Sequence, residues 1–142
     1  MTEVQDSAIE WVSKHTRQYV ESDGKIGHMW NGVRCLVLTT TGRTSGDNRR
    51  NALIYGVDGD KYVIVGSKGG DKHHPHWFLN LIADPNVRVQ VGAEKFDATA
   101  DVASPEEKQR LWPMMVEIWP DYDKYQEKTF RDIPVIVLER SR

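Results

Sequence analysis

The residues best suited to chemistry lie in the segment 41–48, between two predicted strands. This segment holds two glycines, several hydroxyl side chains and Arg43, and Arg49 and Arg50 follow it directly. A turn that only reversed the chain would not need three arginines against the single Asp47. Guanidinium groups bind phosphates and carboxylates through paired hydrogen bonds. The segment is therefore predicted to bind one discrete anionic group.

A second glycine-rich stretch, Gly66-Ser67-Lys68-Gly69-Gly70, ends the third predicted strand, and we expect it to face the same ligand. The first stretch lacks the lysine and the Ser or Thr that complete a P-loop. The second lacks the glycine spacing of a dinucleotide-binding turn. Both motifs are therefore rejected, and the absence of a G-x-S-x-G elbow disfavours a serine hydrolase.

Three histidines at positions 73, 74 and 76 could suggest a zinc site. Adjacent histidines on a loop rarely converge on one metal without further ligands. Cys35 is the single cysteine and lies in an apolar strand, which favours a core thiol over a reactive one and excludes a disulfide within the chain. No metal site is predicted.

Aromatic side chains gather in the segments that flank a second predicted hairpin: Trp77, Trp112, Trp119, Tyr122 and Tyr125. Each one alone is more typical of a core than of a ligand contact. Together with a basic loop they favour a planar aromatic ligand with an anionic tail, because rings or backbone amides can hold the flat part while arginines hold the charge. A flavin-like cofactor fits this description.

The elements that position these residues follow from periodicity and turn signals. A helix is expected over 2–21, with Thr2 and Gln5 as a capping box, and 25–33 is expected to be a loop that shapes a pocket. Further helices are expected after Pro75, after the cap Ser104 with a bend at Pro113, and around the two tyrosines. Three strands within 34–70, a hairpin over 86–102 and a last strand over 134–139 complete the pattern.

About six antiparallel strands of this length curl into a small barrel more readily than they form an open sheet, since closure removes exposed edges. The predicted fold is α+β, mainly β: a split β-barrel with three or four flanking helices. We expect a single domain over 1–142, with an N-terminal helix and pocket loop in 1–33 and the barrel in 34–142.

Composition narrows the function. The chain is 39% hydrophobic and 28% charged, as in folded proteins and not disordered ones. Its net charge of −2 argues against a nucleic-acid binder. No apolar run approaches the length of a membrane span, and the first residues are acidic where a signal peptide would be basic and apolar. A cytoplasmic location is expected, with at most a peripheral membrane contact through the first helix.

A specific resemblance rests on motifs that occur in one order along nearly the whole chain after Arg34. They are Leu38-Thr39-Thr40-Thr41-Gly42-Arg43-Thr44-Ser45-Gly46 with Arg49, Ser67-Lys68-Gly69-Gly70, His74-Pro75-His76-Trp77 with Asn80, Trp119-Pro120-Asp121-Tyr122 with Tyr125-Gln126, and Ile133-Pro134-Val135. In these motifs the chain resembles the deazaflavin (coenzyme F420)-dependent nitroreductase family of actinobacteria, including mycobacteria.

The resemblance implies a split barrel that binds coenzyme F420, a deazaflavin with a phosphate and an oligoglutamate tail. The reduced cofactor would deliver hydride to small organic acceptors: quinones, nitro compounds and activated enones such as coumarin-type lactones. The protein would be a cytoplasmic monomer or weak homodimer, with at most a peripheral contact at the inner face of the membrane and no nucleic-acid partner.

The resemblance also assigns residues. The phosphate and the start of the tail would be held by Arg43, Thr44, Ser45, Gly46, Asp47, Asn48 and Arg49. The deazaflavin would be lined, largely through backbone groups, by Thr39, Leu53, Ile54, Val65, Gly66, Ser67 and Lys68, with support from Trp77 and Asn80. Ala52 replaces the family's usual proline, and Arg50 adds positive charge that could favour longer tails.

Tyr122 and Tyr125 would lie over the substrate side of the ring, as the candidate catalytic residues. Either could supply a proton or a hydrogen bond to the acceptor. An unperturbed tyrosine with a pKa of about 10 is a reluctant acid at neutral pH, so solvent is an equal candidate. Two other functions stay open: a non-catalytic carrier of F420, and a split barrel that binds FMN or haem breakdown products.

Overall fold

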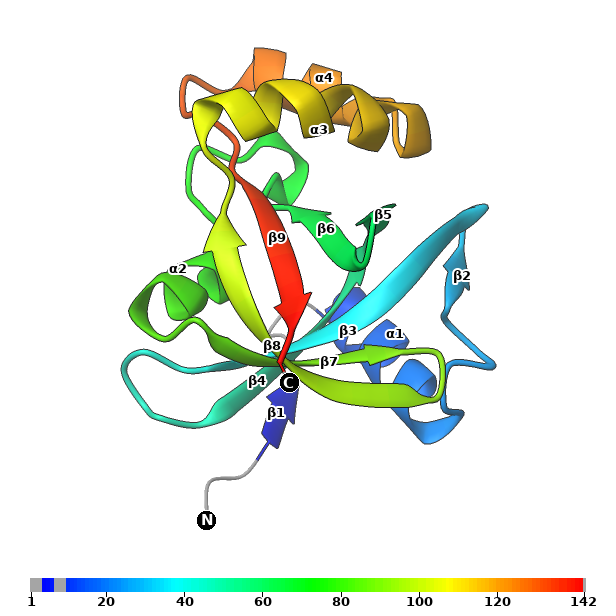
Figure 1. Ribbon diagram of the computed structural model, residues 1–142. Coiled ribbons are helices and arrows are strands. Elements are labelled where there is room, and N and C mark those ends of the chain that lie inside the picture. The colour runs from blue at the N-terminus through cyan, green and yellow to red at the C-terminus, as the bar shows by residue number, and fades with distance from the viewer. Residues whose placement is uncertain (1–3, 7–9, 142) are drawn as a thin grey trace.

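The structure is a computed structural model that describes residues 4–6 and 10–141. Its strands are β1 (Val4–Asp6), β2 (Met29–Trp30), β3 (Val33–Thr41), β4 (Asn48–Ile54), β5 (Gly56–Asp58), β6 (Lys61–Val65), β7 (Asn86–Val91), β8 (Glu94–Val102) and β9 (Val135–Arg140). Its helices are α1 (Glu10–Glu21), α2 (His76–Ala83), α3 (Pro105–Ile118) and α4 (Asp121–Lys128), with a 3-10 turn η1 (Lys68–Gly70). Figure 1 shows α3 and α4 together across one end of a strongly curled sheet.

The strand order explains the curl. Along the sheet the strands run β1-β4-β3-β7-β8-β9-β6-β5, and β2 pairs with β3 to one side. Only Tyr55 separates β4 from β5, although these strands stand near opposite ends of that order. Because consecutive Cα atoms are about 3.8 Å apart, the two ends of the sheet meet at Tyr55. Among the described residues no ladder joins them, so the barrel is split, as predicted.

Alternation along β3 sends its side chains to two faces. Leu36 and Leu38 enter the main core inside the curl, where α2 also packs. Cys35 and Val37 face the other way and pack with Tyr19 of α1. A second core lies under α3 and α4 and contains Val63, Val65, Leu111, Met115, Tyr122, Ile133, Val135 and Val137. The sheet thus presents one face to α1 and the other to α2.

Several local predictions are confirmed. Helix α2 follows Pro75, β7 and β8 form the expected hairpin, and β9 covers the expected last strand. Helix α3 begins with the predicted capping box, in which the Glu107 amide donates to Ser104 Oγ (3.2 Å) and the Ser104 amide donates to Glu107 Oε1 (3.3 Å). These signals succeed because each is contained within a few neighbouring residues.

The predicted start of the N-terminal helix, the expectation of a loop throughout 25–33 and the strand count were wrong, whereas the helix ends at Glu21 as expected. The helix starts at Glu10, because Val4–Asp6 pairs in parallel with β4, and Gln5 therefore caps no helix; Thr2 lies outside the described residues. Met29–Trp30 in the expected loop pairs with β3. With β5 separated from β4, the described residues form nine strands. In each case pairing with a distant strand overrides the local pattern.

Candidate functional site

The loop between β3 and β4 closes mainly on itself. The Gly42 amide donates to the Asp47 carbonyl (2.7 Å), and the Gly46 amide donates to the Gly42 carbonyl (2.9 Å). A β-carbon on Gly42 would lie 2.8 Å from Ser45 Oγ. The tight closure leaves residues 43–46 exposed at the tip. The segment predicted to bind an anion is therefore accessible and fixed in shape.

Asn80 anchors this loop to α2. It is 3% exposed, and its Oδ1 accepts from the Arg43 amide (3.2 Å) and from Arg43 Nη1 (2.8 Å). Its Nδ2 donates to Thr40 Oγ1 (3.3 Å). Arg43 Nη2 also lies 3.3 Å from Nδ1 of His76. Asn80 uses its amide within the protein, which fits the supporting role that the resemblance implied.

Strand β4 separates the other two arginines of the basic segment. Arg49 lies opposite Thr40 and Arg50 lies opposite Thr39 across the ladder. Directly opposed residues share a face, and successive residues alternate between faces. Arg49 is thus on the face of Thr40 and Asn80, together with the anchored Arg43, while Arg50 is on the opposite face.

The same alternation divides the residues predicted to line the deazaflavin. Leu53 packs against the main core, whereas Ile54 packs with Tyr19 on the α1 side. Thr39 and Asn48 line a surface hollow of about 410 Å³ together with Arg88. The structure does not bring the side chains of Thr39 and Ile54 to the face of Leu53 and Arg49.

The turn after β6 has an anion-binding backbone shape. Ser67 is right-handed helical (φ −77°, ψ −37°), and Lys68, Gly69 and Gly70 follow with φ of 45°, 62° and 82°. A right-handed residue followed by a left-handed one turns successive N–H groups into one concavity, or nest, that suits anions. Lys68 is not a glycine, and its conformation costs about 1–2 kcal/mol. Strain of this kind persists only where surrounding contacts fix it.

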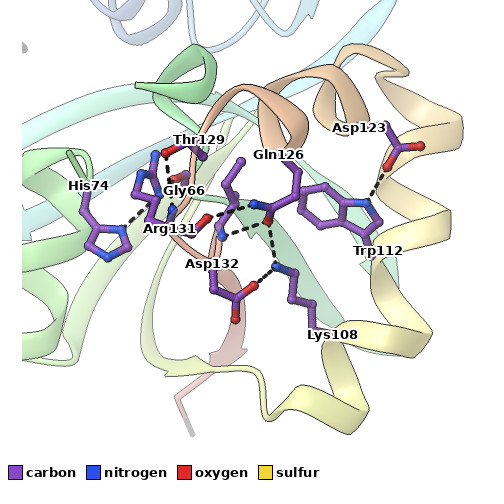
Figure 2. A network of polar contacts seen from close by, with 10 residues as sticks. Gly66, His74, Lys108, Trp112, Asp123, Gln126, Thr129, Arg131 and Asp132 are labelled. Carbon is purple, nitrogen blue, oxygen red and sulfur yellow. Dashed lines mark hydrogen bonds and ion pairs between the residues drawn. The ribbon is translucent and has the colours of Figure 1, made fainter. Parts of the chain in front are cut away.

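Arg131 supplies those contacts, and Figure 2 shows it beside Gly66. Its Nε donates to the Asp71 carbonyl (2.8 Å), Nη1 to the Gly66 carbonyl (3.1 Å) and Nη2 to the Ser67 carbonyl (2.7 Å). Sequence reasoning missed this arginine. It lies 64 residues beyond Ser67, in a loop whose composition carries no signal of a partner.

Two histidines connect the two loops. Nη1 of Arg131 lies 3.0 Å from Nδ1 of His74, as Figure 2 shows, and His76 contacts Arg43. A guanidinium only donates, so Nδ1 of His74 accepts and the ring is neutral. Burial and the Arg131 charge both lower the pKa of His74. The start of α2 therefore lies between the basic loop and the nest, and no three metal-ligating side chains gather anywhere in the described part of the chain.

Close packing fixes the remaining predicted positions near the turn. A β-carbon on Gly66 would lie 2.9 Å from Pro134 Cγ, and one on Gly70 would lie 2.8 Å from the Tyr125 carbonyl. Val65 and Trp77 are buried. These residues hold β6, η1 and α2 against their neighbours. Of the predicted positions 65–68 and Trp77, only Lys68 is exposed.

The two predicted catalytic tyrosines differ in exposure. Tyr122 is 4% exposed in the second core, and burial raises its pKa far above the ordinary value. Tyr125 is half-buried, and its hydroxyl accepts a hydrogen bond from Trp119 Nε1 (3.4 Å). Of the two, Tyr125 is the more accessible, and α4 sets it directly against the turn at Gly70.

Known proteins resemble this chain over nearly its whole length. The family model for F420H(2)-dependent quinone reductase matches residues 11–140. An F420H(2)-dependent quinone reductase of Mycobacterium tuberculosis is 40% identical over 136 residues, which are 93% of this chain and 91% of that protein. The resemblance inferred from the motifs is thereby confirmed.

Solved structures agree. A chain described as an F420-H2 dependent reductase (FDR-A) has a TM-score of 0.69 and 42% identity, over 74% of this chain and 93% of that one. Another, described as a domain-swapped dimer, has a TM-score of 0.71 and 39% identity, over 94% of this chain and 100% of that one. The predictions of a split-barrel oxidoreductase and of reduced coenzyme F420 as hydride donor are confirmed. The chain belongs to the F420H(2)-dependent quinone reductase family.

Proposed function

We propose that this protein reduces small quinones with reduced coenzyme F420, and that nitro compounds and activated enones such as coumarin-type lactones are further acceptors. Family membership supports the quinone reaction. The observation that carries the proposal is the pair of anion-binding elements, the basic loop and the nest, on either side of the first turn of α2. One element would hold the phosphate and tail, and the other would offer amide donors to the ring.

The residues present fit that cofactor. Arg49 lies on the Thr40 face of the sheet, and Arg43 is bound to Asn80, which contacts Thr40. These two arginines would hold the phosphate and the start of the tail, together with groups of residues 44–48. The turn Ser67–Lys68 would offer its amides to polar groups of the deazaflavin part, beside Val65 and Gly66. When bound, the reduced cofactor supplies the hydride. The protein contributes orientation and exclusion of water.

Reduction of a quinone to a hydroquinone also takes up a proton. Because Tyr125 accepts the Trp119 N–H, its own hydroxyl hydrogen remains to be directed at an acceptor oxygen. Tyr122 is buried and its pKa is raised, so its part is to support Tyr125 by edge-on ring packing, with ring centroids 6.2 Å apart. Solvent is the alternative proton source.

A fluorescence titration with F420, and with FMN in a parallel cell, tests the proposal, followed by addition of menadione to the reduced complex. Saturable F420 binding with return of the oxidised cofactor's absorbance is expected. F420 binding without turnover of any quinone, nitro compound or enone would instead indicate a carrier. Preference for FMN would keep the fold and overturn the function.

We further propose that the protein works in the cytoplasm as a monomer or weak homodimer. No helix within residues 4–6 and 10–141 is long and apolar enough to span a membrane. The similar chain described as a domain-swapped dimer supports a dimer. Light scattering over a range of protein concentrations distinguishes the two states.

A further inference from the structure

We propose that Arg131 is a positioning residue of the cofactor site: it holds the turn 66–71 in the one conformation that points the turn's amides at the ligand. The inference rests on the proposed function. Arg131 lies in the loop between α4 and β9, outside every motif that pointed to the cofactor.

The guanidinium determines where the amides of the turn point. Arg131 collects the carbonyl oxygens of Gly66 and Ser67 (3.1 and 2.7 Å). The described chain has no cis peptide bond, and in a trans peptide the N–H points opposite to the C=O. The amides of Ser67 and Lys68 therefore point away from Arg131. These two amides belong to the nest.

Arg131 uses most of its hydrogen-bond donors to hold the turn. Of its five N–H donors, three bond the carbonyls and a fourth faces His74 Nδ1. The residue is half-buried. Arg131 therefore acts on the ligand through the turn and is not itself placed to bind it. Charge-assisted bonds of this kind are about twice as strong as neutral ones, which suits them to hold three consecutive residues at positive φ.

The arginine is itself held from α4 (Figure 2). Gln126 Nε2 donates to the Arg131 carbonyl (2.8 Å), and Gln126 Oε1 accepts from the Ile133 amide (3.0 Å). The same oxygen accepts from Lys108 Nζ (3.2 Å) on α3. Two helices thus fix the backbone that presents the guanidinium to the turn.

The variants Arg131→Ala and Arg131→Lys test the proposal, with Arg110→Ala as the matched control. Arg110 is an arginine whose guanidinium pairs with the Asp58 carboxylate at the surface (3.0 and 2.9 Å), so its hydrogen bonds go to the end of β5 and not to the turn 66–71. We would measure F420 affinity by fluorescence, KM for F420 and for menadione, and thermal unfolding. Lysine keeps the charge but lacks the planar fork that reaches three carbonyls.

Both Arg131 variants are expected to bind F420 about 10- to 100-fold more weakly, because the amides of the turn are then no longer pre-organised for the ligand and must be ordered on binding. KM for F420 should rise while KM for menadione stays unchanged, and added methylguanidinium should restore the affinity of Arg131→Ala. The control should bind as the wild type does.

Wild-type affinity in a folded Arg131→Ala protein overturns the inference, as does an equal loss in Arg110→Ala. If Arg131→Ala fails to fold, the test rests on Arg131→Lys, and wild-type F420 affinity in that variant overturns the inference. A wild-type protein that does not bind F420 is a separate result: it overturns the proposed function, and the inference falls with it.

Discussion

The basic loop 42–47 and the turn 66–71 have similar compositions but are ordered in different ways. The basic loop is closed by hydrogen bonds between its own residues and anchored by Asn80. The turn has three consecutive residues at positive φ. It has two backbone hydrogen bonds of its own, from the Gly70 amide to the Ser67 carbonyl (2.9 Å) and from the Asp71 amide to the Lys68 carbonyl (3.1 Å), but it is also held by one arginine more than 60 residues away. A glycine-rich segment can therefore be rigid for local or for distant reasons. Only the local ones are visible in the segment itself.

The largest expected effect is a loss of F420 affinity on removal of Arg43 from the basic loop and Arg49 from the adjoining β4. The double variant Arg43→Ala/Arg49→Ala should weaken F420 binding at least about a hundredfold, since each hydrogen bond to a charged group contributes about 1.5–3 kcal/mol. Arg50→Ala, which removes a neighbouring arginine from the opposite face of β4, should have a much smaller effect. Fluorescence titration measures both. Equal losses would show that the faces of β4 do not separate cofactor contacts.

A glycine in each region sharpens the comparison. Gly70→Ala combines positive φ with a contact of 2.8 Å to the Tyr125 carbonyl, whereas Gly46→Ala has positive φ and open space. Overpacking costs about 1–3 kcal/mol and left-handed alanine about 1–2 kcal/mol, so Gly70→Ala should lose more stability. Urea unfolding compares them. Equal urea midpoints would mean that α4 shifts at little cost to make room for the methyl group added at Gly70.

Asn80→Ala should loosen the basic loop alone. It removes the acceptor for the Arg43 amide and leaves the bonds of Arg131 intact, at about 1–3 kcal/mol of stability for the buried groups left unpaired. Combined with Arg131→Ala, its effect on F420 affinity should be additive within about 0.5 kcal/mol if the loops are independent. A larger coupling energy would show that His74 and His76 link them.

The smallest expected effect is on the pH dependence of folding stability. His74 has an ordinary pKa of 6.5 when unfolded and a lower pKa when folded. As the pH falls below 6.5, the unfolded chain binds more protons than the folded one, so stability decreases until the folded pKa is passed. His74→Asn keeps an acceptor for Arg131 without titrating and should flatten this decrease. Unfolding midpoints between pH 7 and about pH 5 measure it, and identical slopes would assign the pH dependence to other groups.

The features that could be predicted from the sequence are those fixed by neighbouring residues, and the features that were missed depend on distant ones. The capping box of α3, the hairpin of β7 and β8 and the Pro75 start of α2 are local signals, and all three elements form. The parallel pairing of Val4–Asp6 depends on β4, and the placement of Arg131 depends on carbonyls of a distant turn. Neither can be read from neighbouring residues.

Site residues divide in the same way. Family motifs named Arg43 and Asn80, which the structure joins by hydrogen bonds. The resemblance assigned Thr39, Ile54 and Leu53 to the ring largely through backbone groups. Strand alternation sends the side chains of Thr39 and Ile54 to the face opposite that of Leu53, so these two positions would contact a ligand on the Leu53 face through their backbone. Tyr122 satisfies the motif but packs in a core. A motif identifies positions in the sequence, but strand pairing in the sheet determines the face on which each side chain lies.

The position of β9 has a consequence for how the protein is made. This strand, from late in the chain, pairs with both β6 and β8. Until it has been synthesised, both of those strands keep an open edge, and the residues under α3 and α4 lack Val135 and Val137. Assembly of the barrel is therefore a late event that depends on long-range pairing, which is slow and prone to aggregation. A nascent chain stalled before Val135 should need chaperone protection that the finished chain does not.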